Sequence, residues 1–315
     1  MTDVNANSGS KIIFIGAAIA GIALVIGTLF LSNKDKTGSG LAVEATAEYG
    51  ERLLRDTVLL LGPDQTNPAM RYTGNRLDCA SCHLGSGSEP GTLSLLQSAS
   101  RYPRFMGREN EERDLKDRIN GCMQRSMNGR AFSKDSTELA AMENYILSLG
   151  DQHAAMSESK TSVVEPAAFI EPQRRADLEA GQIVYEQRCQ ICHGENGEGL
   201  KETADIRNGY LFPPVWGADS YNNGAGMNRV LTAARFIKAR MPLGEASLTD
   251  DEAYDVSAYI NSKPRPIKSD LELDYPDLKL KPVDSPYPPY ADPFPQEQHQ
   301  YGPFGPIREY YENLN

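Results

Sequence analysis

The fold is decided by two short stretches, CASCH at residues 79–83 and CQICH at residues 189–193. Each matches the pattern through which haem c is attached to a protein. The two residues between the cysteines set the distance at which the two thiols can add to the two vinyl groups of the haem. The histidine after the second cysteine then brings its imidazole to the iron. A zinc site built from all four cysteines would need closer pairs, and redox disulfides would need no histidine. The sequence therefore predicts two covalent haems c. The attaching residues are Cys79, Cys82, Cys189 and Cys192, and the first iron ligands are His83 and His193.

The segments around these motifs repeat in order. Helical patterns cover 45–61 and 137–149 around the first motif, and 174–188 and 248–261 around the second, with Thr249 as the expected N-cap. Helix, motif, long loop and helix occur twice, which predicts an all-α fold of two tandem cytochrome c-type domains. We expect them at 44–150 and 173–264, joined by a linker at 151–172. The Pro- and Tyr-rich residues 265–315 are expected to form an extended strap across the domains.

The N-terminal residues 1–43 contain an apolar, uncharged run from Ile12 to Leu31. A run of this length can cross a bilayer as a helix, since about 20 residues are needed. A cleaved signal peptide remains an alternative, but small residues for cleavage come only at Ala45-Thr46-Ala47, far downstream. Because haem c is attached outside the cytoplasm, we expect a protein anchored to the inner membrane with its body in the periplasm.

Each iron needs a sixth ligand or an open position. For the second haem, Met241 in KARMPLG lies about 50 residues after His193 and just before the last helix, where a cytochrome c domain supplies its methionine. Met227 is the substitute. For the first haem the corresponding region holds Met106, Met123, Met127 and the lone Cys122. An unpaired thiol is a liability in an oxidising compartment unless it has a use. Cys122 is therefore a candidate for the sixth ligand of the first haem, and the alternatives are a buried free thiol and an intermolecular disulfide.

Charge is distributed unevenly along the chain. The formal net charge is −11, which argues against nucleic acid as a partner. A small anionic substrate would need a local basic pocket. Residues 101–130 supply seven arginines near Cys122, and guanidinium groups suit oxyanions. The seven are Arg101, Arg104, Arg108, Arg113, Arg118, Arg125 and Arg130.

Five segments together resemble the dihaem thiosulfate dehydrogenases, which join two thiosulfates into tetrathionate. They are CASCH, RINGCMQRSMNG, CQICHGENGEG, RMP, and PVDSPYPPYADPFPQEQHQYGPF, and the resemblance covers about residues 45–305. It implies His83 and Cys122 as ligands of an active-site haem, with His193 and Met241 at an electron-transfer haem. It also implies Arg108, Arg118 and Ser126 as substrate residues.

One residue departs from that family. Some members carry a lysine before the ligand methionine, and this lysine can replace the methionine on reduction. Here the position is Arg240, which stays protonated and cannot bind iron, so ligand switching is not expected through it.

The resemblance implies an enzyme that oxidises thiosulfate and passes electrons to a periplasmic c-type cytochrome or similar acceptor. Three alternatives stay open. They are tetrathionate reduction, a dihaem electron carrier without catalysis, and a cysteine-ligated cytochrome that conjugates thiosulfate to a carrier protein. Cys122 and the arginines argue against the simple carrier, and the C-terminal segment favours the dehydrogenase. A peroxidase is disfavoured, since His153 and His299 are expected on the surface or in the strap.

Overall fold

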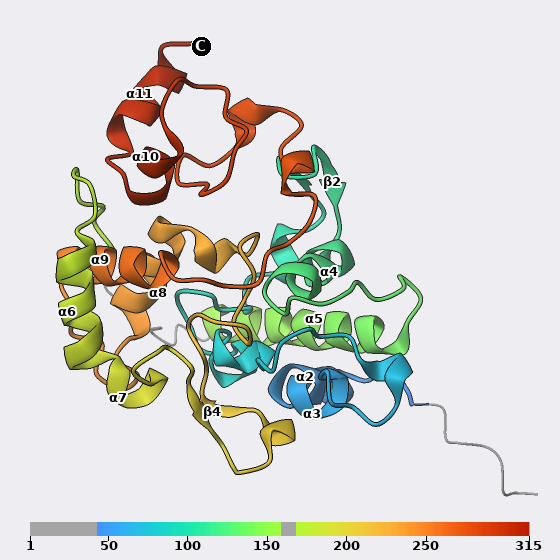
Figure 1. Ribbon diagram of the computed structural model, residues 1–315. Coiled ribbons are helices and arrows are strands. Elements are labelled where there is room, and N and C mark those ends of the chain that lie inside the picture. Colours follow the sequence, from blue (N-terminus) through green and yellow to red (C-terminus); the bar gives the residue numbers. More distant parts are fainter. Residues whose placement is uncertain (1–42, 159–167, 315) are drawn as a thin grey trace, which may run out of the picture. The chain divides into compact units, whose positions relative to one another are not determined.

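A computed structural model describes residues 43–158 and 168–314 (Figure 1). Helices dominate it, and two short antiparallel pairs of strands complete it. The predicted anchor at Ile12–Leu31 lies outside the described residues. Within the two described ranges no helix is both long enough and apolar enough to cross a membrane. Short 3-10 helices connect the longer elements: Pro68–Met70, Cys79–Ser81, Gly85–Gly87, Ala99–Arg101, Ile206–Asn208, Gly226–Asn228, Leu271–Leu273 and Leu278–Leu280.

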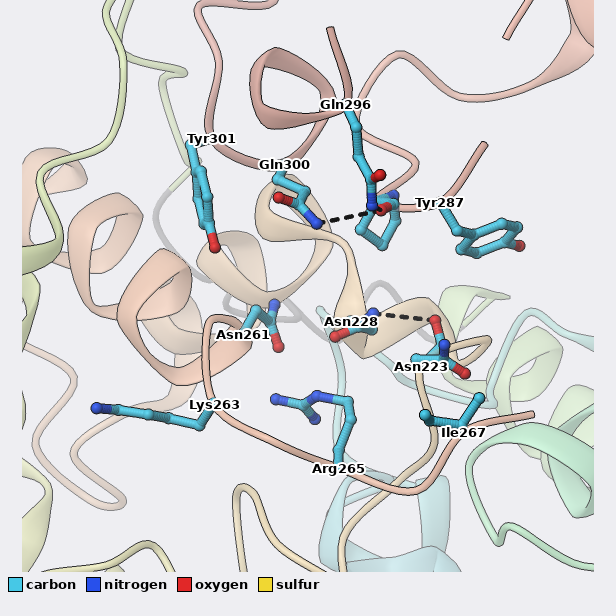
Figure 2. A pocket seen from close by; sticks show the side chains of 11 residues that line it. Asn223, Asn228, Asn261, Lys263, Arg265, Ile267, Tyr287, Gln296, Gln300 and Tyr301 are labelled. Carbon is cyan, nitrogen blue, oxygen red and sulfur yellow. Dashed lines mark hydrogen bonds between the residues drawn. The ribbon is translucent and has the colours of Figure 1, made fainter. Parts of the chain in front are cut away.

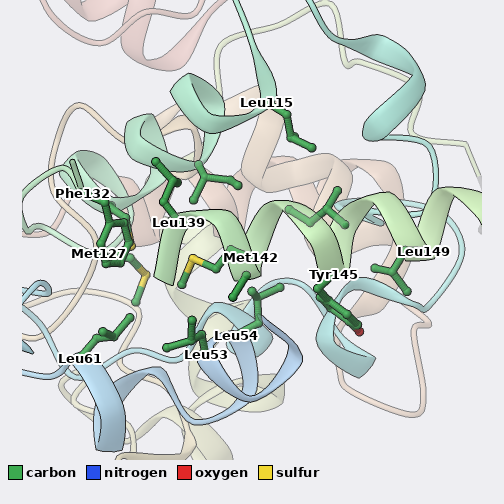
Figure 3. Packing of buried hydrophobic residues seen from close by; sticks show 14 of the residues in the cluster. Leu53, Leu54, Leu61, Leu115, Met127, Phe132, Leu139, Met142, Tyr145 and Leu149 are labelled. Carbon is green, nitrogen blue, oxygen red and sulfur yellow. The ribbon is translucent and has the colours of Figure 1, made fainter. Parts of the chain in front are cut away.

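The first motif region is built on four α-helices and one strand pair. The helices are α2 (Ala47–Arg55), α3 (Thr57–Leu61), α4 (Leu115–Arg125) and α5 (Thr137–Glu158), and the strands are β1 (Arg104–Met106) and β2 (Glu111–Arg113). Leucine and methionine side chains from α2, α4 and α5 form one buried cluster, in which Leu53 and Leu54 meet Met142 (Figure 3). This cluster holds together the elements that surround the first haem motif.

Two of the expected helix limits here are wrong. The predicted helix 45–61 is interrupted at Asp56, whose φ of −111° and ψ of 37° are not helical. The break places the buried hydroxyl of Thr57 where it accepts a hydrogen bond from the Cys79 amide, at 3.1 Å. α5 does not end at Gly150, so the predicted linker begins as helix. Gly150 keeps a helical backbone instead of a left-handed cap, and its missing side chain leaves room for Ala99.

The second motif region repeats this arrangement with α6 (Leu178–Arg188), α7 (Gln190–His193), α8 (Val230–Arg240) and α9 (Asp250–Asn261). The strand pair is β3 (Leu200–Lys201) with β4 (Tyr210–Phe212). α6 starts later than predicted, because Asp177 caps it through the amides of Glu179 and Ala180. The predicted N-cap of α9 is confirmed, since the Thr249 side chain accepts from the Glu252 amide.

A glycine marks the main helix crossing in each region. A side chain on Gly50 of α2 would meet the Ala141 carbonyl of α5 at 2.0 Å, and one on Gly181 of α6 would meet the Asp255 carbonyl of α9 at 2.2 Å. Backbones this close require glycine at the contact. The helix before each haem motif therefore packs against the last helix of its own region, and the same architecture occurs twice (Figure 1).

Residues 265–314 contact both regions, but they are not extended throughout. They contain two 3-10 turns and two α-helices, α10 (Gln296–Tyr301) and α11 (Gly305–Glu312). The fully buried carboxylate of Asp284 pairs with Arg229 and accepts from the Leu231 amide at 3.1 Å, which caps α8. His299 lies in this tail, where only 1% of it is exposed and it stacks on Tyr290 at 3.7 Å. The tail is thus a folded extension, and its buried Phe304 and Ile307 pack in one hydrophobic cluster with residues of α8 and α9.

Candidate active site

A cavity of about 1050 Å³ opens beside the first motif. Its size is at the upper end of the roughly 300–1,000 Å³ of ordinary ligand sites. Cys79, His83 and Cys122 line it together with apolar side chains such as Leu54 and Ile146. The cavity thus combines an apolar wall with the attachment thiol and two potential iron ligands, which suits a haem.

The two motif histidines are oriented in the same way. The Nδ1 atom of His83 lies 2.7 Å from the Leu93 carbonyl, and that of His193 lies 2.8 Å from the Pro213 carbonyl. A carbonyl can only accept, so each Nδ1 carries the proton and each Nε2 keeps its lone pair. Metal-ligating histidines are usually held in this manner. Both side chains therefore fit the role of an iron ligand.

The thiol of Cys122 differs electrostatically from the attachment thiols. Burial raises the pKa of Cys79 to about 12, and that of Cys82 and Cys189 to about 11. Burial would also raise the pKa of Cys122, but positive charge next to the sulfur, above all that of Arg118, lowers it to about 6. The lowered pKa favours the thiolate form of Cys122, and the thiolate is the form that binds metal.

α4 sets the position of this thiolate. Asp114 and Asp117 form a capping box at its start, and Cys122 follows Arg118 by one helical turn. The Nη1 atom of Arg118 lies 3.0 Å from the Cys122 sulfur. Met123, the next residue, belongs to the buried core with 1% exposed and also lines the cavity. The helix thereby presents sulfur and guanidinium to the cavity as a pair.

Five of the seven predicted arginines line the cavity, namely Arg101, Arg104, Arg108, Arg113 and Arg118. The other two have structural partners: Arg125 is buried against Asp274, and Arg130 stacks on Tyr72 at 3.7 Å. Ser126 is not among the described residues that line the cavity. It directly follows α4, and its backbone carbonyl accepts a hydrogen bond from the side-chain Nδ2 of Asn75 at 2.8 Å.

Sequence reasoning missed several cavity residues, among them His153, which was expected on the surface or in the strap but lines the cavity. Arg229 and Arg235 come from the start and middle of the α8 segment, and Tyr275 comes from the C-terminal tail. They lie more than 100 residues after Cys122 in the sequence. No local pattern connects them to α4, because only the tertiary fold brings these segments together.

The second motif lies in a separate apolar cluster. Met241 directly follows α8, and both Met241 and the alternative Met227 pack against this cluster with Cys189. Trp216 and Tyr259 close it from the side. The cluster fits the apolar surroundings of a haem, and either methionine remains available as ligand.

The guanidinium of Arg240 is engaged elsewhere. It donates to the Pro90 carbonyl and pairs with Glu89 at 3.4 Å, both in the loop after the first motif. Arg240 therefore connects the Met241 segment with the first motif region.

A second, smaller pocket of about 260 Å³ lies between the end of α9 and the tail. Figure 2 shows Arg265 and the amides of Asn228, Asn261 and Gln300 around it. Among the described residues that line this pocket there is no cysteine, histidine or methionine. It therefore offers no haem ligand, and the large cavity is the better candidate for chemistry.

Comparison with known families divides the chain in the same way. Residues 72–153 match the family described as SoxA/TsdA, cytochrome c domain. Residues 176–260 match the family described as cytochrome C oxidase, cbb3-type, subunit III. Each match contains one CxxCH motif, so the predicted pair of cytochrome c domains is confirmed, and with it a requirement for two haems c.

Relatives that match about two thirds of the chain are named thiosulfate dehydrogenase. The protein of Stutzerimonas stutzeri is 36% identical over 221 residues, which are 69% of each chain. That of Allochromatium vinosum is 39% identical over 69% of this chain and 77% of its own. That of Psychrobacter arcticus is 38% identical over 64% of this chain but only 61% of its own length.

A solved structure also matches. It is the thiosulfate dehydrogenase (TsdBA) from Marichromatium purpuratum in its "as isolated" form, at 34% identity and a TM-score of 0.60. The match covers 74% of this chain and 49% of that one. The similarity thus includes both motif regions.

Proposed function

Because the chain belongs to the thiosulfate dehydrogenase family, we propose that it oxidises two thiosulfate dianions to one tetrathionate dianion and releases two electrons. One sulfur–sulfur bond forms between the two thiosulfates, and no proton is taken up or lost. The observation that carries this proposal is the position of the Cys122 sulfur, which lies 3.0 Å from Arg118 Nη1 in a cavity that His83 and several arginines also line.

The arginines bind and orient the substrate. Arg108 and Arg118 offset the charge of the dianions and reduce the repulsion that keeps two of them apart. Arg118 has a double role, because it also holds the Cys122 sulfur at 3.0 Å. Ser126, which the resemblance also implies as a substrate residue, is not one of the described residues that line the cavity, so no substrate contact is proposed for it.

Haem c, when bound, supplies iron centres that accept one electron at a time. His83 and Cys122 are the proposed ligands in the first domain, and His193 and Met241 in the second. A thiolate ligand favours the ferric state, whereas a methionine raises the potential. This difference favours electron flow from the first domain to the second, and then to a periplasmic cytochrome or similar acceptor.

The test uses purified protein with both haems attached. Thiosulfate with an artificial electron acceptor measures the forward reaction, and tetrathionate with a reduced donor measures the reverse. We expect tetrathionate to form in the forward assay. Turnover only in the reverse assay would identify the protein as a tetrathionate reductase. No turnover in either assay would identify it as an electron carrier without catalysis.

We also propose that Ile12–Leu31 anchors the protein to the inner membrane with its haem domains in the periplasm. The support is the uncharged apolar run and the location of haem c attachment. Fractionation of cells that express the full chain tests it. Recovery of a soluble form whose N-terminus lies after residue 33 would show cleavage instead.

A further inference from the structure

Two consecutive residues of the C-terminal tail hold the two segments that carry Arg108 and Cys122. The Asp274 carboxylate binds both Nη atoms of Arg125, at 2.8 and 2.6 Å, and Arg125 is three residues after Cys122 on α4. The Tyr275 amide donates to the Arg108 carbonyl at 2.8 Å. These contacts fasten the tail to both sides of the substrate cavity.

The ring of Tyr275 also faces the cavity. It lies 5.8 Å from the Arg108 guanidinium, and Tyr275 lines the cavity although only 6% of it is exposed. Its φ of +60° is the left-handed conformation that side chains other than glycine rarely adopt. Surrounding contacts must offset this strain, and such residues occur often at functional sites.

Arg108 is held differently from its neighbours. Arg113 and Arg125 each pair with carboxylates. No ion pair connects Arg108 to a carboxylate within the described part of the chain, and its buried Nε atom has no hydrogen-bond partner. An aromatic face orders a guanidinium without neutralising it. The charge of Arg108 therefore stays available to an incoming anion.

We propose that Tyr275 is a positioning residue that fixes Arg108 for binding a divalent oxyanion, so that the C-terminal tail forms part of the substrate site. The inference rests on the proposed function for the identity of the anion as thiosulfate. The effect on binding does not depend on turnover. A guanidinium that is ordered before the anion arrives loses less entropy on binding, whether or not the anion reacts.

The experiment compares tail variants of the full-length protein with both haems attached. Tyr275→Leu removes the ring, and Tyr275→Phe keeps it. Tyr290→Leu is the matched control, because Tyr290 is a tail tyrosine that stacks on His299 and does not line the cavity. The KM for thiosulfate is measured together with the affinity for sulfate by calorimetry, since sulfate is a dianion that cannot be oxidised.

Loss of one cation–aromatic contact at a desolvated site, together with the lost ordering, should weaken dianion binding by about tenfold. We expect Tyr275→Leu to raise both the KM for thiosulfate and the Kd for sulfate by this factor, with kcat within about twofold of the wild-type value. Tyr290→Leu should bind as the wild type does, and Tyr275→Phe should bind better than Tyr275→Leu, because it keeps the ring and loses only the hydroxyl near Arg108. In an Arg108→Gln background, Tyr275→Leu should have no further effect, because no guanidinium remains to be positioned.

Three results would overturn the proposal: unchanged sulfate affinity in Tyr275→Leu, an equal loss in Tyr290→Leu, or full additivity with Arg108→Gln. Absence of sulfate binding by the wild type would also count against it. If Tyr275→Leu does not fold, Tyr275→Gly replaces it, because glycine accepts the positive φ and keeps the amide that binds Arg108. Failure of thiosulfate turnover alone, with the sulfate results as expected, would refute the proposed function and leave this inference standing.

Discussion

Replacing Asp274 with asparagine should destabilise the protein strongly, because it leaves a buried guanidinium without its counter-charge. The side chains of Arg125 and Asp274 are 9% and 8% exposed, and two hydrogen bonds connect them. Tyr287 donates a third to the same carboxylate at 2.7 Å. The asparagine keeps the shape of the side chain but turns one acceptor into a donor that faces Arg125.

The size of the effect follows from this burial. Removing one partner of a buried ion pair costs about 3–5 kcal/mol. Since about 1.4 kcal/mol is a factor of ten, the unfolding equilibrium should shift by a factor of about 10² to 4 × 10³. Glu297→Gln is the control, because its pair with Arg175 is 55% and 62% exposed and is worth at most about 1 kcal/mol.

Urea unfolding of the protein with both haems attached, followed by circular dichroism and haem absorbance, measures the difference. The double variant Arg125→Met/Asp274→Leu should lose less stability than Asp274→Asn, because it buries no unpaired charge. If Asp274→Asn and Glu297→Gln unfold at the same urea concentration, the pair contributes nothing and the tail is not anchored by charge.

The remaining predictions concern ligands and pH. Cys122→Met should keep a folded dihaem protein, raise the potential of the first haem and lower turnover by orders of magnitude. Redox titration, the electron paramagnetic resonance spectrum and the thiosulfate assay measure this, and turnover near the wild-type rate would show that Cys122 is not needed for catalysis. Arg118→Ala should chiefly raise the KM for thiosulfate while kcat falls less. Met241→Gly should abolish the near-infrared methionine–iron band of the ferric second haem and slow electron exit; an unchanged band would identify Met227 as the ligand. Burial lowers the pKa of Lys281 from 10.5 to about 8. Between these pH values the folded protein therefore binds fewer protons than the unfolded chain, and Lys281 makes the free energy of unfolding rise with pH. Lys281→Met should reduce this rise in urea unfolding, and an unchanged pH dependence would contradict the prediction.

The parts predicted correctly from the sequence depend on short-range chemistry. The spacing in CxxCH requires no tertiary contact to be recognised, and the Thr249 cap of α9 is decided within four residues. Positive charge near Cys122 was expected from the arginines of residues 101–130, and Arg118, four residues before Cys122, supplies it. In each case the interacting groups are close in the sequence.

The errors come from tertiary contacts. Gly150 was expected to end a helix, but in the folded chain it accommodates Ala99 and the helix continues. The break at Asp56 positions Thr57 against Cys79, 22 residues later. Tyr275 could not be assigned to the cavity, since it reaches Arg108 from more than 150 residues away. Helix propensity is a weak preference, and such contacts override it.

The tail contacts both helices that position the proposed sulfur ligands Cys122 and Met241. α4 carries Cys122, and the tail holds its C-terminal end through Asp274. α8 leads into Met241, and the tail caps its N-terminal end through Asp284. Each helix is therefore fixed by one buried carboxylate, and the two carboxylates lie ten residues apart in the tail. The helix crossings at Gly50 and Gly181, by contrast, do not involve α4 or α8. Positions of sulfur ligands must be set closely for their potentials to differ reliably. A segment that contacts both helices can fix them together, which a repeat of two independent domains could not do.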